Sequence, residues 1–273
     1  MKRLFQSDTI LLIVVLIVAA LLRFYHLDGS SLWHDEGNTW ALVQRGYGQI
    51  ARDAAADIHP PGYYWLLKGW TSVFGISAYA MRSLSAIAGL LLVYAVYAIG
   101  QAVSDEPSSF PRGRLPYFAL LAGWLAALNP FQIYYSQEAR MYSLLALESA
   151  GLFWALLVLQ RRQRETVLQG VRSRWFALPS ASYVLFGAAG LWTHYSFPVV
   201  LAAAGLAYLI VWLLASRQHR FVWQALYQFV ALNVLILLSY LPWLATAVDS
   251  LLNWPKGGPV SYTHLTLPTT IPS

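Results

Sequence analysis

The chain contains no cysteine, which excludes disulfides, thiolate catalysis and cysteine-ligated zinc. It also has little charge: 11% of its 273 residues are charged and 58% are hydrophobic. A soluble domain carries about 25% charged residues, so this deficit predicts a membrane protein. The net charge of +6 comes from basic residues spread over the loops between apolar runs. That distribution indicates membrane topology and gives no reason to expect a nucleic-acid partner.

Long apolar runs recur along the chain. A membrane-spanning helix needs about 20 mostly apolar residues. In lipid every backbone polar group must be paired within the segment, which makes each such run a helix. The sequence therefore predicts an all-α, polytopic membrane bundle of about seven spans. The predicted spans are residues 8–24, 78–100, 117–135, 141–159, 179–195, 197–215 and 222–245.

Basic residues define the expected orientation. Lys2 and Arg3 predict a cytoplasmic N-terminus. The same segment resembles a signal peptide, but no small-x-small cleavage site precedes Arg23 and further spans follow, so we expect an uncleaved helix. Residues 61–75 are too few for a span and predict an interfacial helix in the first outer loop. The arginine-rich segment 160–178 then lies inside, as in a multi-pass protein of the cytoplasmic (inner) membrane.

Polar and ionisable residues gather on the predicted outer side of the membrane. They form the groups His34, Asp35 and Glu36; His59 before two prolines; Gln137, Glu138 and Arg140; and His194. Such groups at membrane depth are costly and usually mark function. A carboxylate here can act as general base toward a hydroxyl, and an arginine can hold a phosphate. Together they predict transfer of a group from a phosphorylated lipid carrier.

Structural interpretations of the same residues remain open at this point. Asp35 and Glu36 are also what a solvated loop would carry, and Glu138 with Arg140 would suit a plain ion pair. His59 would suit a helix cap. Glu148 lies about 15 Å of helix beyond Glu138, and we expect a structural partner for it inside the bundle.

Three stretches carry a family resemblance: "RFYHLDGSSLWHDEGNTWALV", "HPPGYYWLLKGW" and "NPFQIYYSQEARMYSLLAL". Their order and spacing resemble polyprenyl-phosphate-dependent membrane glycosyltransferases of the GT-C fold. That family includes the protein O-mannosyltransferases (glycosyltransferase family 39) and the lipid A aminoarabinose transferases. The resemblance covers roughly residues 9–245. The W-x-D-E and Y-S-Q-E-A-R-M-Y elements are its more specific parts, whereas H-P-P alone is weak.

The resemblance implies a reaction and roles for individual residues. A sugar linked to undecaprenyl or dolichyl phosphate would pass, with inversion, to an acceptor lipid, glycan or protein on the extracytoplasmic face. Asp35 would be the general base, Glu36 would orient the site or the sugar, and Arg140 would neutralise the phosphate leaving group. Further expected contacts to the donor come from Glu138, His59, Arg23 and Tyr135. No cofactor is implied; a divalent metal among the histidines and carboxylates is an alternative without fixed ligand spacing.

Two other functions fit a chain of this kind. A transporter or flippase of a lipid-linked substrate would use the same outer surface, although such proteins tend to show internal repeats, which this sequence lacks. A non-catalytic membrane scaffold would tolerate loss of Asp35.

The end of the sequence differs from the rest. Residues 260–273 have no charge and no amphipathic period, and Val260–Leu265 resembles the translation of a sequencing adapter. We expect this segment to be a non-native read-through tail. Residues 1–259 would then be the N-terminal part of a GT-C membrane domain.

Overall fold

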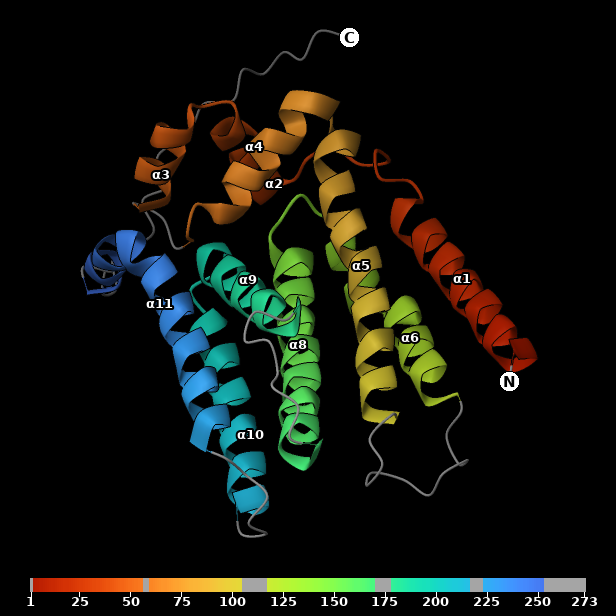
Figure 1. Cartoon of the computed structure of the whole chain (residues 1–273). Helices are drawn as coiled ribbons and strands as arrows, with labels where there is room; N and C mark the ends of the chain where they lie inside the picture. The colour runs from red at the N-terminus through yellow and green to blue at the C-terminus, as the bar shows by residue number, and fades with distance from the viewer. Residues whose placement is uncertain (1, 56–58, 105–116, 170–177, 217–222, 253–273) are drawn as a thin grey trace, which may run out of the picture.

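The computed structural model describes residues 2–55, 59–104, 117–169, 178–216 and 223–252, so the expected tail at 260–273 lies outside the described residues. All regular elements in these ranges are helices, as predicted (Figure 1). They are α1 (Lys2–Phe24), α2 (His34–Val43), α3 (Tyr47–Ala55), α4 (Gly62–Phe74), α5 (Ala78–Ser104), α6 (Phe118–Leu128), α7 (Pro130–Ser136), α8 (Tyr142–Gln169), α9 (Leu178–Thr193), α10 (Phe197–Ser216) and α11 (Trp223–Leu252).

Four helices are long and apolar enough to cross a membrane: α5, α8, α10 and α11. They correspond to four of the seven predicted spans. Two shorter apolar helices, Thr9–Phe24 and Phe118–Leu128, and the 16-residue α9 cover the positions of the others. Many large apolar side chains on α10 and α11 are exposed, as expected for helices that face lipid. The helices therefore indicate a membrane protein.

The segment 117–135, predicted as one span, is not one continuous helix, because it is broken between α6 and α7. Pro130 has no amide hydrogen and cannot continue a helical hydrogen-bond ladder. The side chain of Asn129 instead caps α7 by accepting a hydrogen bond from the Gln132 amide at 3.1 Å. The first piece, α6, has 11 residues and is about 17 Å long.

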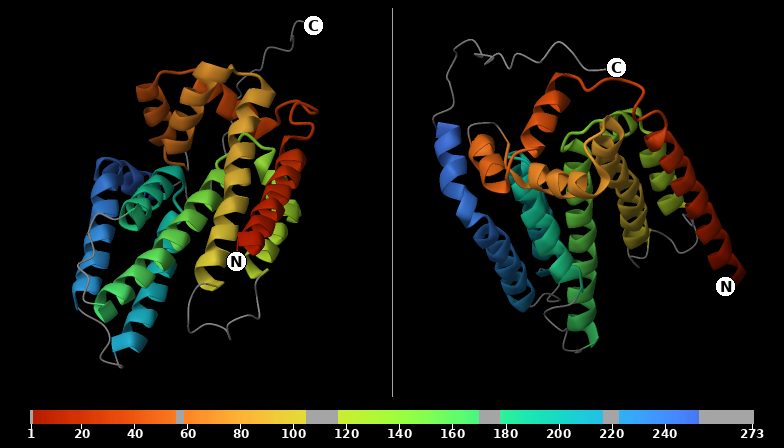
Figure 2. Two further views of the ribbon diagram at one scale, coloured as in Figure 1. Left: turned by 45° about the vertical axis from the view of Figure 1, so that its right-hand side comes forward. Right: turned by 90° about the horizontal axis from the view of Figure 1, so that it is seen from above.

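The short helices α2, α3 and α4 lie together over one end of the bundle, which we call the capped end (Figures 1 and 2). Here α4 contacts α2, α5 and α9. Residues 61–75 were expected to form a helix too short to span, and α4 has 13 residues. Gly62 permits the contact with α9, since a Cβ there would lie 2.5 Å from the carbonyl oxygen of Trp192.

Buried apolar residues form separate clusters within the bundle and beneath the capped end. One lies beneath α2–α4 and includes Ile50, Tyr63, Leu67 and Met81. A larger one joins α8, α9, α10 and α11. A third joins α1, α5 and α6. Because the first cluster links α4 to α5 and to residues 139–141, segments distant in sequence are fixed around one site.

Candidate functional site

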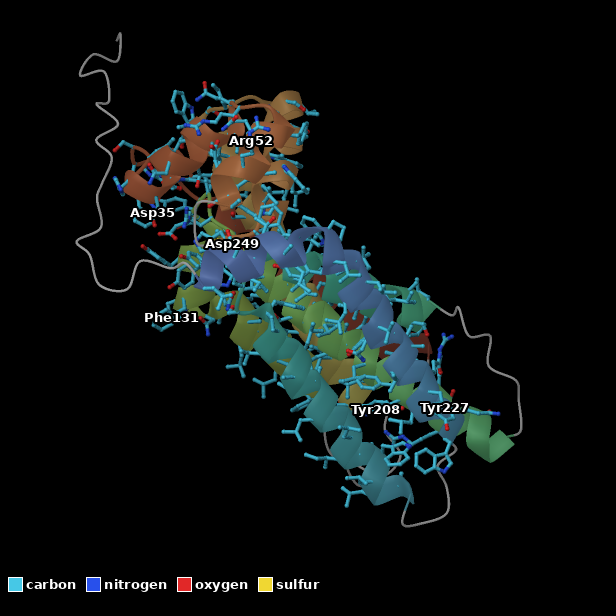
Figure 3. The ribbon with its side chains drawn as sticks, turned by 90° about the vertical axis from the view of Figure 1, so that its left-hand side faces the viewer. Asp35, Arg52, Phe131, Tyr208, Tyr227 and Asp249 are labelled. Carbon is cyan, nitrogen blue, oxygen red and sulfur yellow. The ribbon has the colours of Figure 1, made fainter. Side chains whose placement is uncertain are left out.

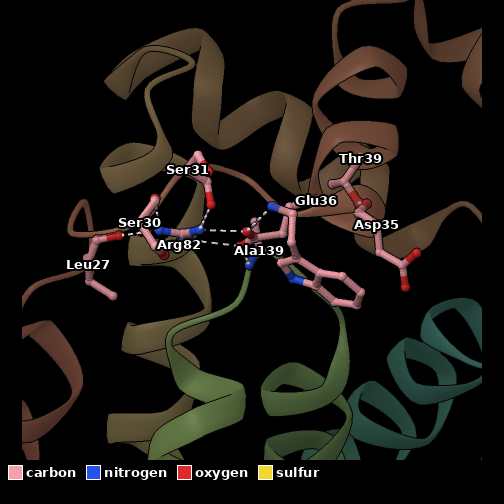
Figure 4. Close-up of polar contacts among 9 residues, drawn as sticks. Leu27, Ser30, Ser31, Asp35, Glu36, Thr39, Arg82 and Ala139 are labelled. Atoms are coloured by element: carbon pink, nitrogen blue, oxygen red, sulfur yellow. Dashed lines mark hydrogen bonds and ion pairs between the residues drawn. The ribbon is translucent and has the colours of Figure 1, made fainter. Parts of the chain in front are cut away.

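The two adjacent carboxylates at the start of α2 have different surroundings. Successive residues of an α-helix point about 100° apart, so Asp35 and Glu36 cannot face the same way. Glu36 is completely buried, whereas the Asp35 side chain is 36% exposed. Figure 4 shows the Asp35 carboxylate pointing away from Glu36 and its partners. Asp35 and Glu36 are adjacent in the sequence, but the helix points their carboxylates in different directions.

Glu36 forms a buried ion pair with Arg82 of α5. Arg82 donates from Nε to Oε1 at 2.8 Å and from Nη2 to Oε2 at 2.6 Å. Oε1 also accepts from the Ala139 amide at 2.8 Å, and Oε2 from the Trp33 amide at 3.4 Å. Burial would raise the pKa of Glu36, but these hydrogen bonds outweigh it and lower the pKa.

Arg82 also fixes the segment between α1 and α2. Its Nη1 donates to the carbonyl oxygens of Leu27 at 2.6 Å and Ser30 at 3.0 Å, and its Nη2 to that of Ser31 at 3.2 Å (Figure 4). The guanidinium thus uses all its donor groups within the protein. It joins α5, α2 and this segment into one rigid unit.

Arg140, just before α8, lies beside Asp35. Its Nη2 is 3.8 Å from Asp35 Oδ2, and its Nη1 donates to the Asp35 carbonyl at 3.4 Å and to Thr39 Oγ1 at 3.3 Å. Thr39 in turn donates to the Asp35 carbonyl at 3.0 Å. The buried Nε of Arg140 has no hydrogen-bond partner among the described residues. Arg140 therefore has an unused, buried donor beside the partly exposed Asp35 carboxylate.

Two histidines complete this group. His59 is buried and its Nε2 is 3.5 Å from Arg140 Nη2. The His194 ring lies 5.1 Å from the His59 ring, centroid to centroid. Burial, with a smaller effect of the Arg140 charge, lowers the pKa of His194 and favours its neutral form. Asp35, Arg140, His59 and His194 are thus successive neighbours at the capped end.

Glu138 is buried near this group. Burial raises its pKa, as do the charges of Glu36 and Asp35, while a hydrogen bond from Tyr134 and the charge of Arg140 act in the opposite direction. The aromatic ring of Tyr135 packs against that of Tyr142 at 5.0 Å. Among the described residues, Tyr135 makes no hydrogen bond with Asp35 or Arg140.

Two predicted residues have partners elsewhere. Arg23 is buried at the end of α1 and donates to the carbonyl oxygens of Ala126 and Ala127, each at 3.1 Å, at the C-terminal end of α6. Glu148 lies inside the bundle, where its Oε1 accepts a hydrogen bond from Thr193 Oγ1 at 2.9 Å. Glu148 thus has the structural partner that the sequence led us to expect.

Arg82 and Thr39 are the residues that sequence reasoning missed. A signal for Arg82 was present, since an arginine inside the predicted span 78–100 is costly unless it is paired. Its partner Glu36 lies 46 positions away, and the sequence alone does not connect them.

A cavity of about 790 Å³ lies away from this group, between α5 and α8. Among the described residues no group of three or more His, Asp or Glu side chains is placed to hold a metal ion. No family model, curated protein or solved structure matches this chain. Its function must therefore be argued from the site.

Proposed function

We propose that this chain is a polyprenyl-phosphate-dependent glycosyltransferase of the GT-C type. Its active site would lie at the capped end, on the extracytoplasmic face of the cytoplasmic membrane. In this proposal α1, the α6–α7 pair and α9 complete seven membrane passages beside the four long helices. The supporting observation is the partly exposed Asp35 carboxylate 3.8 Å from the buried Arg140 guanidinium.

This pair contains the two groups that the reaction needs. The Asp35 carboxylate accepts the proton of an acceptor hydroxyl as the oxygen attacks the anomeric carbon of the sugar. The bond from that carbon to the phosphate oxygen breaks, and its electron pair stays on the polyprenyl phosphate. The sugar is transferred with inversion. The leaving phosphate gains one negative charge, which Arg140 stabilises from a preorganised position.

The neighbouring residues act as positioning groups. Thr39 and the Asp35 carbonyl orient the Arg140 guanidinium. Of the roles expected for Glu36, orientation of the site fits its geometry, because its buried carboxylate is occupied by Arg82 and the Ala139 amide. His59 lies against Arg140 and His194 packs beside His59, and a neutral His194 would add no positive charge to compete with Arg140 for a phosphate.

The test compares Asp35→Asn with the unaltered chain. Membranes containing each form receive undecaprenyl phosphate carrying a labelled sugar, and release of undecaprenyl phosphate is measured. Loss of a general base lowers turnover by about 10²- to 10⁴-fold. Asp53→Asn is the matched control, since Asp53 is a partly exposed carboxylate on α3 that pairs with Arg45. The control variant should keep full turnover.

Two results would count against the proposal. Equal turnover in Asp35→Asn and the unaltered chain would remove Asp35 from the mechanism. Movement of the labelled donor across the membrane without a new glycosidic bond would support the transporter alternative instead.

A further inference from the structure

His194 lies in the short turn between α9 and α10. Its carbonyl oxygen accepts a hydrogen bond from the Phe197 amide at 3.0 Å, which closes the turn. The helix α10 runs away from the capped end, since Figure 3 shows Tyr208 of α10 and Asp35 toward opposite ends of the molecule. The turn therefore holds the partly exposed His194 ring on the side of the molecule that carries Asp35.

The contacts of His194 fix which of its ring nitrogens carries the proton. Nδ1 accepts a hydrogen bond from the Ser196 amide at 3.0 Å, and the Ser196 hydroxyl lies 2.8 Å from the same nitrogen. A backbone N–H group can only donate, so Nδ1 carries no proton and the proton of the neutral ring is on Nε2. Burial favours the same neutral form by lowering the pKa of His194. His194 therefore presents one donor, its Nε2–H group.

Two donors beside the same histidine have no acceptor in the protein. Nε2 of His194 makes no hydrogen bond among the described residues. The buried Nε of Arg140 has none there either, and an unpaired buried donor is costly. His59 lies between them, since its Nε2 is 3.5 Å from Arg140 Nη2 and its ring is 5.1 Å from the His194 ring. A ligand that satisfies both donors must offer acceptor oxygens.

We propose that the Nε2–H group of His194 donates a hydrogen bond to a phosphate oxygen of the polyprenyl-phosphate donor, beside Arg140. This inference rests on the proposed function and adds a binding residue to it. A phosphate group has several acceptor oxygens and accepts from both side chains at once. As the sugar leaves, the phosphate gains one negative charge and the hydrogen bond strengthens. No proton is transferred, and the ring stays neutral.

A directed neutral donor suits this site because acidic groups share it. The Asp35 carboxylate is 3.8 Å from Arg140. Glu138 is close enough for the charges of Arg140 and Asp35 to affect its pKa. Recognition of the phosphate by His194 therefore depends on the position of its N–H group and not on an excess of positive charge.

Two substitutions separate the donor from the contact with Ser196. An asparagine places its oxygen near the position of Nδ1, so His194→Asn keeps an acceptor for the Ser196 amide and removes the Nε2 donor. A glutamine places its NH₂ group near the position of Nε2, so His194→Gln keeps a donor for the phosphate. His26→Asn is the matched control. His26 is exposed at the end of α1 with φ of 59°, a conformation that asparagine tolerates.

The experiment uses the full chain in phosphatidylcholine nanodiscs. Binding of undecaprenyl phosphate and of undecaprenol is measured by quenching of tryptophan fluorescence, and the helicity of each variant is compared with that of the unaltered chain. The unaltered chain should prefer the phosphate. His194→Asn should lower this preference about 10- to 100-fold, the effect of one hydrogen bond to a charged group. His194→Gln should retain most of it, and His26→Asn all of it.

A merely structural role of His194 predicts a different pattern. It would weaken both ligands equally, and it would make His194→Gln at least as harmful as His194→Asn. Either result would overturn the proposal, as would an unaltered chain without preference for the phosphate. Sugar transfer at the full rate by His194→Asn would refute this assignment alone. A phosphate preference that depends on His194, in a chain that transfers no sugar, would support the assignment and refute the proposed reaction.

Discussion

Replacement of Glu36 by glutamine tests whether the adjacent carboxylates have different tasks. Glutamine keeps the shape of the side chain and can still accept hydrogen bonds at Oε1. Its NH₂ group would replace Oε2, which now accepts hydrogen bonds from Arg82 at 2.6 Å and from the Trp33 amide. The new NH₂ group would then face the N–H groups of Arg82 and Trp33, which are also donors. The buried Arg82 would lose its counter-ion.

The expected cost is large because both partners are buried. Removing one member of a buried ion pair costs about 3–5 kcal/mol. The free energy of unfolding of a domain is only about 5–15 kcal/mol. Glu36→Gln should therefore remove a large fraction of the stability. Asp35→Asn should cost about 0–1 kcal/mol, because Asp35 is partly exposed and its ion pair with Arg140 spans 3.8 Å.

The assay is urea unfolding in detergent micelles, followed by tryptophan fluorescence. The free energy of unfolding is compared among Glu36→Gln, Asp35→Asn and the unaltered chain. A free energy for Glu36→Gln within about 1 kcal/mol of the unaltered chain would refute the structural role of the Glu36–Arg82 pair. An equal loss in both variants would refute the separation of roles.

The same pair predicts a pH dependence of stability. The pKa of Glu36 is lowered in the folded state, so the folded protein binds fewer protons at this group than the unfolded chain. Its contribution is fully present above the ordinary glutamate value of 4.5 and is lost as the pH falls through the lower folded pKa. The unaltered chain should lose stability below about pH 4.5, and Glu36→Gln should lack this component.

Three further substitutions test contacts within and between the helices, by the same unfolding measurement. Gly62→Ala places a Cβ 2.5 Å from the Trp192 carbonyl and should cost about 1–3 kcal/mol; an unchanged value would mean that α4 and α9 separate easily. Asn129→Ala removes the cap of α7 and should cost about 1 kcal/mol, whereas Asn129→Ser should cost less. Thr193→Val leaves the buried Glu148 without its hydrogen-bond donor and should cost about 1–3 kcal/mol. In a chain that already carries Glu148→Gln, the same substitution should not have this cost.

The helices illustrate where sequence reasoning succeeds. A long apolar run forms a helix in lipid whatever its neighbours in the fold, because its backbone polar groups must pair within the segment. The helices α5, α8, α10 and α11 therefore follow from composition alone. The break at Asn129 was missed because residues 118–128 are so apolar that they dominate the average hydropathy of residues 117–135. The dipeptide Asn-Pro was the local signal, since proline ends a helical ladder whatever the hydropathy of its neighbours.

The sequence by itself determined the membrane class, the helical content and the ionisable residues that are candidates for the site. These candidates are Asp35, Arg140, His59 and His194. These features depend on side-chain type and local spacing. The tertiary structure decided how they are used. Burial of Glu36 and its pairing with Arg82 arise from packing of α2 on α5, across 46 positions of sequence. Only that packing leaves Asp35 exposed beside Arg140, because charge and burial depend on neighbours that local sequence does not specify.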